Sequence, residues 1–342
     1  MARPAAATGR ATRDRHPARR AQPRRAAEPV PPVRLPRDRD TVVVKLGERS
    51  VTLTNLGKPF WPEDGIAKGD LLQYYADVAP VLLPHIRDRA MVMKRYPNGA
   101  AGPFFFMKRA PTPRPDWIET CAIEHASGNV IDFPVIQDVL ALLWVVNLGC
   151  IDLNEWYATC DDVDRPTYLH FDLDPTDGAT FPQIREAALV VRDALEALGM
   201  PSHAKTTGSR GIHVYVPIVR GPTQGEVWAL AKRISHDVAR RHPALLTAVY
   251  AKARRPRRRV LVDYNQNAWG RTLASVYSVR PKPRAPVSMP VSWKEIARGF
   301  DVADFRLENA RARIAKVGDL WAPLLAEARP RVDLRPLLTA AG

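Results

Sequence analysis

The sequence predicts an α+β fold, a mixed α/β chain in which helices flank mixed sheets, and two observations predict it. Predicted strands follow one another directly between residues 90 and 135 and again between 202 and 218. This order differs from the regular strand–helix–strand alternation of a Rossmann unit and favours mixed sheets. The chain has 342 residues, 46% of them apolar, which suffices for one large or two ordinary domains with a real core.

The chain is strongly basic, with a net charge of +15 and an isoelectric point near 10.1. A basic excess of this size is typical of proteins that bind a polyanion, either nucleic acid or an anionic membrane surface. The most apolar run, residues 139–151, is too short to span a membrane and predicts a buried helix and its exit. Composition therefore favours nucleic acid as the partner, and no membrane.

Several other classes of protein are disfavoured by missing motifs. The three cysteines, Cys121, Cys150 and Cys160, form no Cys-x-x-Cys pair, so a structural zinc site or a disulfide framework is not expected. We expect a reducing cytoplasm, because the N-terminus also shows no secretory apolar segment. The chain contains neither a phosphate-binding P-loop nor the Lys-x-Asp-Gly tetrapeptide of nucleotidyl-lysine ligases.

The elements of the N-terminal part can be placed in order. Residues 1–40 are mainly Arg, Ala and Pro, so we expect a disordered basic tail that either adds affinity for phosphates or is only a solvated linker. Order is expected from about Asp40, in a unit covering 41–342 with an N-terminal part (41–150), a core (151–300) and a helical C-terminal segment (301–342). The N-terminal part contains a predicted hairpin at 41–55, a helix from about Lys68, four strands between 90 and 135, and a helix at 136–149.

The core begins with the strand "YLHFDLDP" at 168–175, followed by a predicted helix at 181–200. Strands are then expected at 202–207 and 211–218, a helix at 223–242 and a further strand at 258–265. Side chains two residues apart share one face of a strand, so Asp172 and Asp174 point the same way while Phe171 and Leu173 face the other side. Two adjacent carboxylates repel each other unless a cation lies between them. They indicate either a metal site or ordinary caps of the following loop.

Asp263 offers a third carboxylate at the end of the strand "RRVLVDYN". If this strand lies beside the first, Asp263 comes opposite Asp172 and Asp174, and the three could hold two divalent ions. Oxygen-only ligands favour magnesium or manganese. A pair of such ions suits in-line phosphoryl transfer. The alternative is that Asp263 only forms the turn before Asn265.

The segment "KTTGSRGIHVYV" between the acidic strands predicts an anion-binding turn. Gly208 and Gly211 permit a tight turn with exposed backbone N–H groups. The turn also carries cationic and hydroxyl donors, namely Lys205, Thr206, Thr207, Ser209, Arg210 and His213. His213 could instead be a buried structural histidine. Arg280 in "VYSVRPKP" is a further candidate phosphate clamp, or else part of a surface ion pair.

In this order, "HFDLDP", "KTTGSRGIHVYVP" and "VDYNQNAWGRTLASVYSVRPKPRAPVSMPVSW" resemble the polymerase domain of the bacterial non-homologous end-joining ligase D family. This family lies within the archaeo-eukaryotic primase superfamily, and the closest likeness is to its stand-alone actinobacterial forms. The resemblance extends from about Val42 to about Arg329. It implies a primase-like catalytic core of mixed sheets flanked by helices.

The resemblance also assigns roles to residues. It implies that Asp172, Asp174 and Asp263 are the metal ligands. The nucleotide contacts that it implies are Lys94, Thr207, Arg210, His213 and Arg280, beside Ser209 of the turn. Contacts with DNA are implied for Lys58 and Lys68, which would hold a downstream 5′-phosphate, and for Phe105 and Phe106, which would lie near the templating base. From the residues alone, the two lysines could be ordinary surface residues and the two phenylalanines core residues.

Three positions depart from the family pattern. Thr207 stands where Ser is usual and Arg210 where Lys is common, and both replacements keep the donors. Asn154 stands where the family often has His. This last difference concerns metal or sugar contacts and indicates a distinct subgroup.

We therefore expect a template-dependent DNA/RNA nucleotidyltransferase, a primase-polymerase that fills short gaps in DNA repair with two manganese or magnesium ions. The resemblance implies a preference for ribonucleotides and for manganese, gapped or broken DNA with a 5′-phosphate and nucleoside triphosphates as partners, a separate DNA ligase, Ku, and a bacterial nucleoid-associated location. A metal-dependent nuclease could use the same carboxylates. A non-catalytic nucleic-acid-binding module would explain the charge alone.

Overall fold

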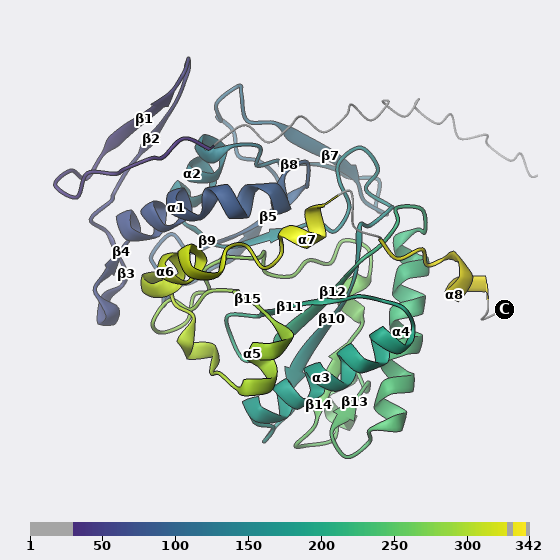
Figure 1. Cartoon of the computed structure of the whole chain (residues 1–342). Helices are drawn as coiled ribbons and strands as arrows, with labels where there is room; N and C mark the ends of the chain where they lie inside the picture. Colours follow the sequence, from purple (N-terminus) through teal and green to yellow (C-terminus); the bar gives the residue numbers. More distant parts are fainter. Residues whose placement is uncertain (1–29, 327–330, 340–342) are drawn as a thin grey trace, which may run out of the picture.

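The computed structural model of the chain describes residues 30–326 and 331–339, so most of the predicted basic tail lies outside the described residues (Figure 1). Order was expected only from about Asp40, and the structure shows contacts with the fold from Val33 onward. Val33 is buried, and the backbone N–H of Leu35 donates to Gln73 Oε1 at 2.8 Å. Arg34 forms an ion pair with Asp77 at 3.0 Å. These contacts attach residues 33–35 to the helix that starts at Lys68.

The largest sheet has six strands in the order β13–β14–β10–β12–β11–β15 (Figure 1). Their bounds are β10 Tyr168–Pro175, β11 His203–Thr206, β12 Ile212–Pro217, β13 Leu246–Thr247, β14 Val260–Asp263 and β15 Pro290–Val291. Neighbouring strands are antiparallel except β13 and β14. The sequence predicted the four longer strands. It missed β13 and β15, because two residues are too few to show an alternating pattern.

Two helices, α3 (Phe181–Ala197) and α4 (Gln224–Arg241), cover one face of this sheet, and both contact β10 (Figure 1). A capping box fixes the start of α4. The backbone N–H of Thr223 donates to the Glu226 carboxylate at 2.7 Å, and the Thr223 hydroxyl accepts from the Glu226 N–H. Phe171 and Leu173 are fully buried in the core beneath these helices. The polar side chains of β10 therefore face the other half of the molecule.

That other half contains a three-stranded sheet in the order β6–β5–β9, formed by Phe105–Met107, Met91–Arg95 and Cys150–Glu155. Helices α1 (Lys68–Ile86) and α2 (Val139–Asn147) pack against each other beside it. The two-stranded pairs are β1 Val42–Leu46 with β2 Arg49–Leu53, β3 Pro59–Trp61 with β4 Ile66–Ala67, and β7 Thr120–Glu124 with β8 Val130–Pro134. The predicted hairpin at 41–55 is formed, and it projects from the body (Figure 1).

Strand β9 was not predicted, because residues 150–155 follow the apolar helix without a turn signal beyond Gly149. The expected boundary at residue 150 falls on its first residue, and the division into parts stays a prediction. Helix α5 (Trp293–Arg298) ends just before the C-terminal segment, which contains α6 (Leu307–Val317), α7 (Ala322–Leu325) and α8 (Arg335–Thr339). Short 3₁₀ turns lie at Pro62–Asp64, Lys252–Arg254, Asn265–Asn267 and Val302–Asp304.

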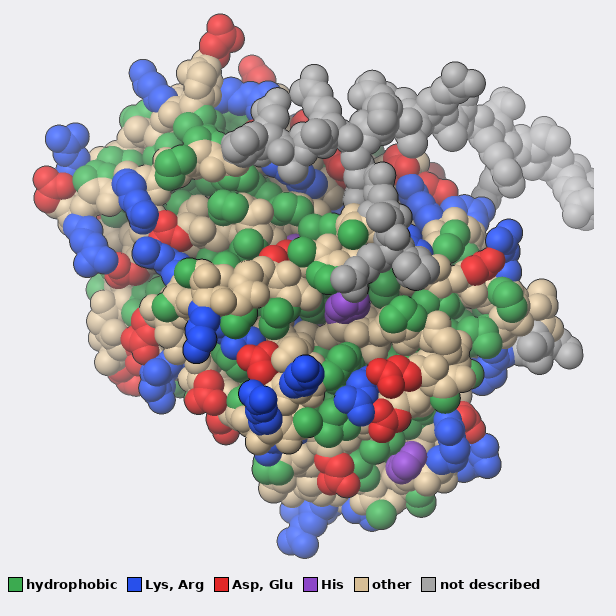
Figure 2. All heavy atoms as spheres, viewed as in Figure 1, with side chains coloured by type: hydrophobic (Ala, Val, Ile, Leu, Met, Phe, Trp, Pro, Cys, Tyr) green, Lys and Arg blue, Asp and Glu red, His purple; other side chains and the backbone are tan. Residues whose placement is uncertain are grey.

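Buried tyrosines join the two halves. The Tyr74 hydroxyl of α1 donates to the carbonyl of Tyr277 at 2.8 Å, and the backbone N–H of Val279 donates to the Tyr75 hydroxyl at 3.0 Å, which attaches α1 to the segment between β14 and β15. One hydrophobic cluster contains residues of α1, β9, β10 and α3. In the part of the chain that the structure describes, no helix is both long and apolar enough to span a membrane. Lys and Arg are interspersed with Asp and Glu on the face with α3, α5 and α6, so the basic excess is not gathered there (Figure 2).

Candidate active site

Two acidic residues meet across neighbouring strands of the six-stranded sheet. Strand β10 pairs with β14 antiparallel, and this register places Asp172 directly opposite Asp263. Asp174 lies two residues further along β10, on the same face as Asp172. The prediction that a neighbouring strand brings Asp263 opposite the acidic strand is thus confirmed.

The carboxylates raise one another's pKa. Burial and then the charge of Asp263 raise the pKa of Asp172 to about 7. The charge of Asp172 and then burial raise the pKa of Asp174 to about 7. Burial also raises the pKa of Asp263, although hydrogen bonds from Asn265 N and Gln266 Nε2, at 2.7 and 3.3 Å, oppose this shift. Carboxyl groups with raised pKa values are costly to ionise unless a cation lies nearby.

The donor set fits a hard divalent ion, because it consists of carboxylate oxygens, and the buried Asp172 Oδ1 has an ion-pair contact with His213 Nε2 at 3.2 Å but no hydrogen bond of good geometry. Across residues 30–326 and 331–339, however, no three His, Cys, Asp or Glu side chains converge in a group that could hold an ion. The chemistry of the residues therefore supports a metal site. The complete three-carboxylate, two-ion arrangement stays a prediction.

The predicted anion-binding turn, residues 207–211, connects β11 to β12 and lies beside the end of β10. The Thr207 hydroxyl accepts hydrogen bonds from the backbone N–H groups of Ser209 and Gly211, both at 3.1 Å. A Cβ on Gly211 would lie 2.3 Å from the carbonyl oxygen of Leu173, so only glycine lets the turn approach β10 this closely. Arg210 is exposed, and its charge lowers the pKa of Asp174.

Arg280 and Lys94 converge on a buried carboxylate that the sequence analysis did not identify. The side chain of Asp152, on β9, lies 3.2 Å from Arg280 Nε and 3.9 Å from Lys94 Nζ, each measured to Oδ2. Arg280 also donates from Nη1 to the carbonyl oxygen of Thr207 at 2.8 Å. A Cβ on Gly208 would lie 2.6 Å from Arg280 Cγ, and Gly208 has a φ of +64°, so glycine makes room for the clamp.

His213 lies between the carboxylates and the interior. Its Nε2 is 3.2 Å from Asp172 Oδ1, and its Nδ1 is 2.7 Å from Lys205 Nζ. Burial holds the pKa of His213 well below its usual range. The sequence predicted that Lys205 is a donor of the turn, and this prediction is wrong. Lys205 is fully buried and points away from the surface.

Arg255 is another residue that the sequence analysis did not identify. Its charge lowers the pKa of both Asp174 and Asp263. It belongs to the run "KARRPRRR" at 252–259, which includes six basic residues and precedes β14. This run was the available signal, because a basic segment immediately before an acidic strand end places cations beside the carboxylates.

Lys58 and Lys68 line a cavity of about 260 Å³ in the N-terminal half. Lys58 Nζ donates to Pro97 O and Asn98 Oδ1 at 2.8 and 3.1 Å. Lys68 Nζ donates to Thr54 O and Asn147 Oδ1 at 2.7 and 2.8 Å. Burial and then the charge of Lys58 lower the pKa of Lys68 to about 8. The cavity thus brings together two cations that were predicted to share one anion.

Lys68 is the first residue of α1, and a helix start suits a terminal phosphate only where its first backbone N–H groups are free. The first backbone N–H groups of α1 are not free, because Lys68 N donates to Lys58 O at 2.9 Å and Gly69 N donates to Leu56 O at 2.8 Å. An anion in this cavity would be held by the ammonium groups and by side chains, with little help from the helix N-terminus.

The predicted aromatic residues lie on the surface. Phe104, Phe105 and Phe106 are 51%, 44% and 60% exposed, so none of the three belongs to the core. Lys94 Nζ lies 4.2 Å from the centroid of the Phe104 ring and 5.6 Å from that of Phe106. The phenylalanines are therefore adjacent to the Lys94–Asp152–Arg280 cluster, where they are available to stack on a base.

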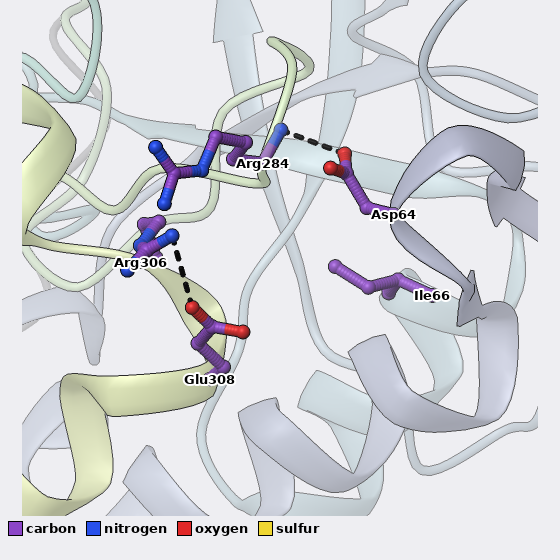
Figure 3. Close-up of a pocket in the computed structure, with 5 residues that line it drawn as sticks. All are labelled: Asp64, Ile66, Arg284, Arg306 and Glu308. Atoms are coloured by element: carbon purple, nitrogen blue, oxygen red, sulfur yellow. Dashed lines mark hydrogen bonds and ion pairs between the residues drawn. The ribbon is translucent and has the colours of Figure 1, made fainter.

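A separate small hollow of about 70 Å³ is lined by Asp64, Ile66, Arg284, Arg306 and Glu308 (Figure 3). The backbone N–H of Arg284 donates to Asp64 at 2.7 Å, and Arg306 pairs with Glu308 at 3.0 Å. None of the predicted site residues lines this hollow, so it is not part of the candidate active site.

The raised pKa of Asp174 predicts a specific pH dependence of stability without metal. Because the folded pKa of about 7 exceeds the unfolded value of about 4, the stability contributed by this group is lost as pH rises from about 4 through about 7. Chelator-treated protein should therefore become less stable than Asp174→Asn as the pH rises from about 5 to about 8, by at least about 1 kcal/mol. Urea unfolding measures this difference. Asp177→Asn, in the exposed loop after β10, is the control. If the free energies of unfolding of Asp174→Asn and of the unaltered protein change in parallel with pH, the proposed repulsion is contradicted.

The chain matches one family model over residues 67–321, the LigD primase-polymerase domain. The multifunctional non-homologous end joining protein LigD of Mycolicibacterium smegmatis is 34% identical over 280 residues, 81% of this chain and 36% of that protein. The bifunctional non-homologous end joining protein LigD of Bacillus subtilis is 29% identical over 266 residues, 78% of this chain and 42% of that protein. The chain thus spans well under half the length of these relatives.

A solved structure is also similar, the polymerase domain from Mycobacterium tuberculosis Ligase D in complex with DNA. It superposes with a TM-score of 0.76 at 32% identity, covering 82% of this chain and 99% of that domain. This match confirms the predicted mixed α/β fold. It also confirms the resemblance to the polymerase domain of the ligase D family. The chain belongs to the LigD primase-polymerase domain family.

Proposed function

We propose that this chain is a template-dependent nucleotidyltransferase that adds nucleotides to a primer strand and fills short gaps during DNA repair. The observation that carries the proposal is the Asp172–Asp263 pair in register on adjacent strands, with the turn at 207–211 and Arg280 beside it. The family membership supports the same activity, since the similar relatives are named for non-homologous end joining and the similar structure holds DNA.

In this proposal Asp172, Asp174 and Asp263 hold two divalent ions, manganese or magnesium. Bound there, the ions supply charge stabilisation for the attacking 3′-oxygen and the leaving pyrophosphate. The chain's own groups hold the triphosphate. Arg210 and Arg280 donate charge-assisted hydrogen bonds to phosphate oxygens, and the Thr207 hydroxyl, which accepts from two backbone N–H groups of the turn, keeps its own proton to donate.

Lys94 and Arg280 fit this role because, among the described residues, Asp152 is the only acid that forms an ion pair with either of them. Asp152 is buried and faces both cations, so it orients two positive side chains while neutralising one charge. The net positive charge left at the cluster favours a polyphosphate. A nuclease built on the same carboxylates has no need for this cluster, so binding of a nucleoside triphosphate separates the two functions.

The surrounding surface fits gapped DNA. Phe105 and Phe106 offer exposed rings for the templating base beside the nucleotide site. Lys58 and Lys68 offer two ammonium groups in one cavity for a downstream 5′-phosphate. We also propose a preference for ribonucleotides and manganese, joining by a separate DNA ligase, cooperation with Ku, and a location in the bacterial cytoplasm. These five points rest on the family resemblance.

Removal of a strand carboxylate should abolish nucleotide addition and spare DNA binding. Asp172→Ala and Asp263→Ala should each lower primer extension by at least about 100-fold, because each removes charge that stabilises the transition state. Extension of a primed template and binding titrations of the same DNA measure the two effects. Asp177→Ala should extend like the unaltered protein. Extension near the unaltered rate in either strand variant would refute the proposed metal site.

A downstream 5′-phosphate should strengthen binding to a short gap by about 10-fold, since a terminal phosphate carries more charge than an internal diester. The double change Lys58→Ala, Lys68→Ala should erase this preference and leave binding to plain primer-template almost unchanged. Titrations at fixed ionic strength with phosphorylated and hydroxyl-ended gaps measure it.

The matched control is Lys45→Ala, Lys316→Ala, which removes the same charge from exposed positions away from the cavity. This control should weaken binding to both gaps equally and keep the preference. Equal affinity of the unaltered protein for the two gaps would refute the proposal that the cavity binds a downstream 5′-phosphate.

A further inference from the structure

Lys205 is the most completely buried cation of the described residues, and the proposed chemistry gives it no direct role. Its side chain leaves β11 toward the interior, and its exposed fraction is 0%. Nζ has three polar neighbours, each at 2.7 Å: the carbonyl oxygen of Ala274, the hydroxyl oxygen of Ser288 and Nδ1 of His213. Three neighbours match the three N–H donors of an ammonium group.

Two of these neighbours can only accept from Lys205. Ala274 offers a carbonyl oxygen, which has no proton. The Ser288 hydroxyl already donates its proton to the carbonyl oxygen of Thr206 at 2.8 Å, so it accepts from Lys205. The third contact, with His213, therefore depends on whether the amine carries its third proton.

Several neighbours of Lys205 stabilise its protonated form and so oppose the effect of burial, which lowers its pKa. The rings of Tyr215 and Trp321 lie with their centroids 5.9 and 5.8 Å from Nζ, a cation–π distance. The buried Glu155 carboxylate acts on Lys205 and opposes the effect of burial, which lowers its pKa to about 7. A carbonyl, a hydroxyl oxygen, two ring faces and a carboxylate together form a cavity suited to a cation.

An ammonium at this distance determines which nitrogen of His213 carries the ring proton. Lys205 donates to Nδ1, so Nδ1 is an acceptor and the proton of the neutral ring is on Nε2. Nε2 is the nitrogen that faces the carboxylates, 3.2 Å from Asp172 Oδ1. The opposite tautomer would place an N–H against the ammonium and turn a lone pair toward Asp172, which is unfavourable at both ends.

We propose that Lys205 is a positioning residue that holds His213 in the Nε2–H tautomer, so that an oriented N–H donor faces the nucleotide side of Asp172. The assignment of His213 as a nucleotide contact rests on the proposed function. The tautomer of His213 does not depend on the proposed function, and it can be measured in the protein without substrate. Lys205 acts through His213, because its own Nζ is enclosed by the interior.

Histidine-selective ¹⁵N labelling with long-range ¹H–¹⁵N correlation spectra distinguishes the two tautomers. The chain has eight histidines, and His213→Gln identifies the signals of His213 by their loss. The unaltered protein should show a protonated Nε2 and an unprotonated Nδ1. Lys205→Met, which removes the donors but keeps an unbranched chain, should shift His213 toward the Nδ1–H tautomer.

Nucleotide kinetics give the second measurement. Lys205→Met should raise the KM for nucleoside triphosphate about 10-fold, while affinity for primer-template DNA stays within about twofold of the unaltered value. Lys205→Gln keeps an amide N–H donor at this position. It should retain the Nε2–H tautomer and recover at least part of the KM, which a purely structural role for the ammonium does not predict.

Two results would overturn the proposal. One is an Nδ1–H tautomer in the unaltered protein, which decides the matter even where Lys205→Met does not fold. The other is a Lys205→Met protein with the original tautomer and an unchanged KM. Absence of extension by the unaltered protein would instead refute the proposed function and leave the spectra as the test of the tautomer.

Discussion

The structure depends on one pairing of like charges, Asp172 opposite Asp263 on adjacent buried strands. Two carboxylates in this position destabilise the fold unless a cation joins them, and burial strengthens the repulsion. The apolar residues on the other face of β10 keep the strand pairing in register in spite of this repulsion. A slip of one residue would expose Phe171 and Leu173 and bury both acids of β10 beneath α3 and α4. The hydrophobic core therefore stabilises a site that is electrostatically unfavourable on its own.

The same pairing organises the polar residues around it. The turn at 207–211 approaches β10 closely because Gly211 lacks a Cβ, and Arg280 reaches the carbonyl of Thr207 across the space left by Gly208. Asp152 on β9 then connects Arg280 to Lys94 of the other half. Through these contacts the six-stranded sheet contributes the carboxylates, and the three-stranded sheet helps to orient the cations. Neither half alone contains the whole site.

Much of the fold and of the candidate site could be predicted from the sequence, because the informative residues lie in strands with a clear alternating pattern. Period-two alternation placed Asp172 and Asp174 on one face, and the apolar strand before Asp263 indicated a neighbour. Asp152 was missed because β9 follows a buried helix directly, with Gly149 as the one turn residue between them. The inward course of Lys205 was missed because a lysine beside a Gly-Ser-Arg-Gly turn usually faces solvent, and only the tertiary structure supplies its three acceptors. The hydrogen bonds that occupy the first N–H groups of α1 come from the loop at 56–58 folding back, which has no local pattern.

We propose that the paired strand carboxylates hold divalent ions. The most direct measurement is a manganese titration followed by electron paramagnetic resonance, with a nucleoside triphosphate present, on the unaltered protein and on Asp263→Asn. This variant removes one negative charge with almost no change in shape. Two bound manganese ions per chain are expected for the unaltered protein, and Asp263→Asn should lose at least one of them. An unaltered protein that binds no manganese, or a variant that binds as many ions with the same affinity, would contradict the proposal.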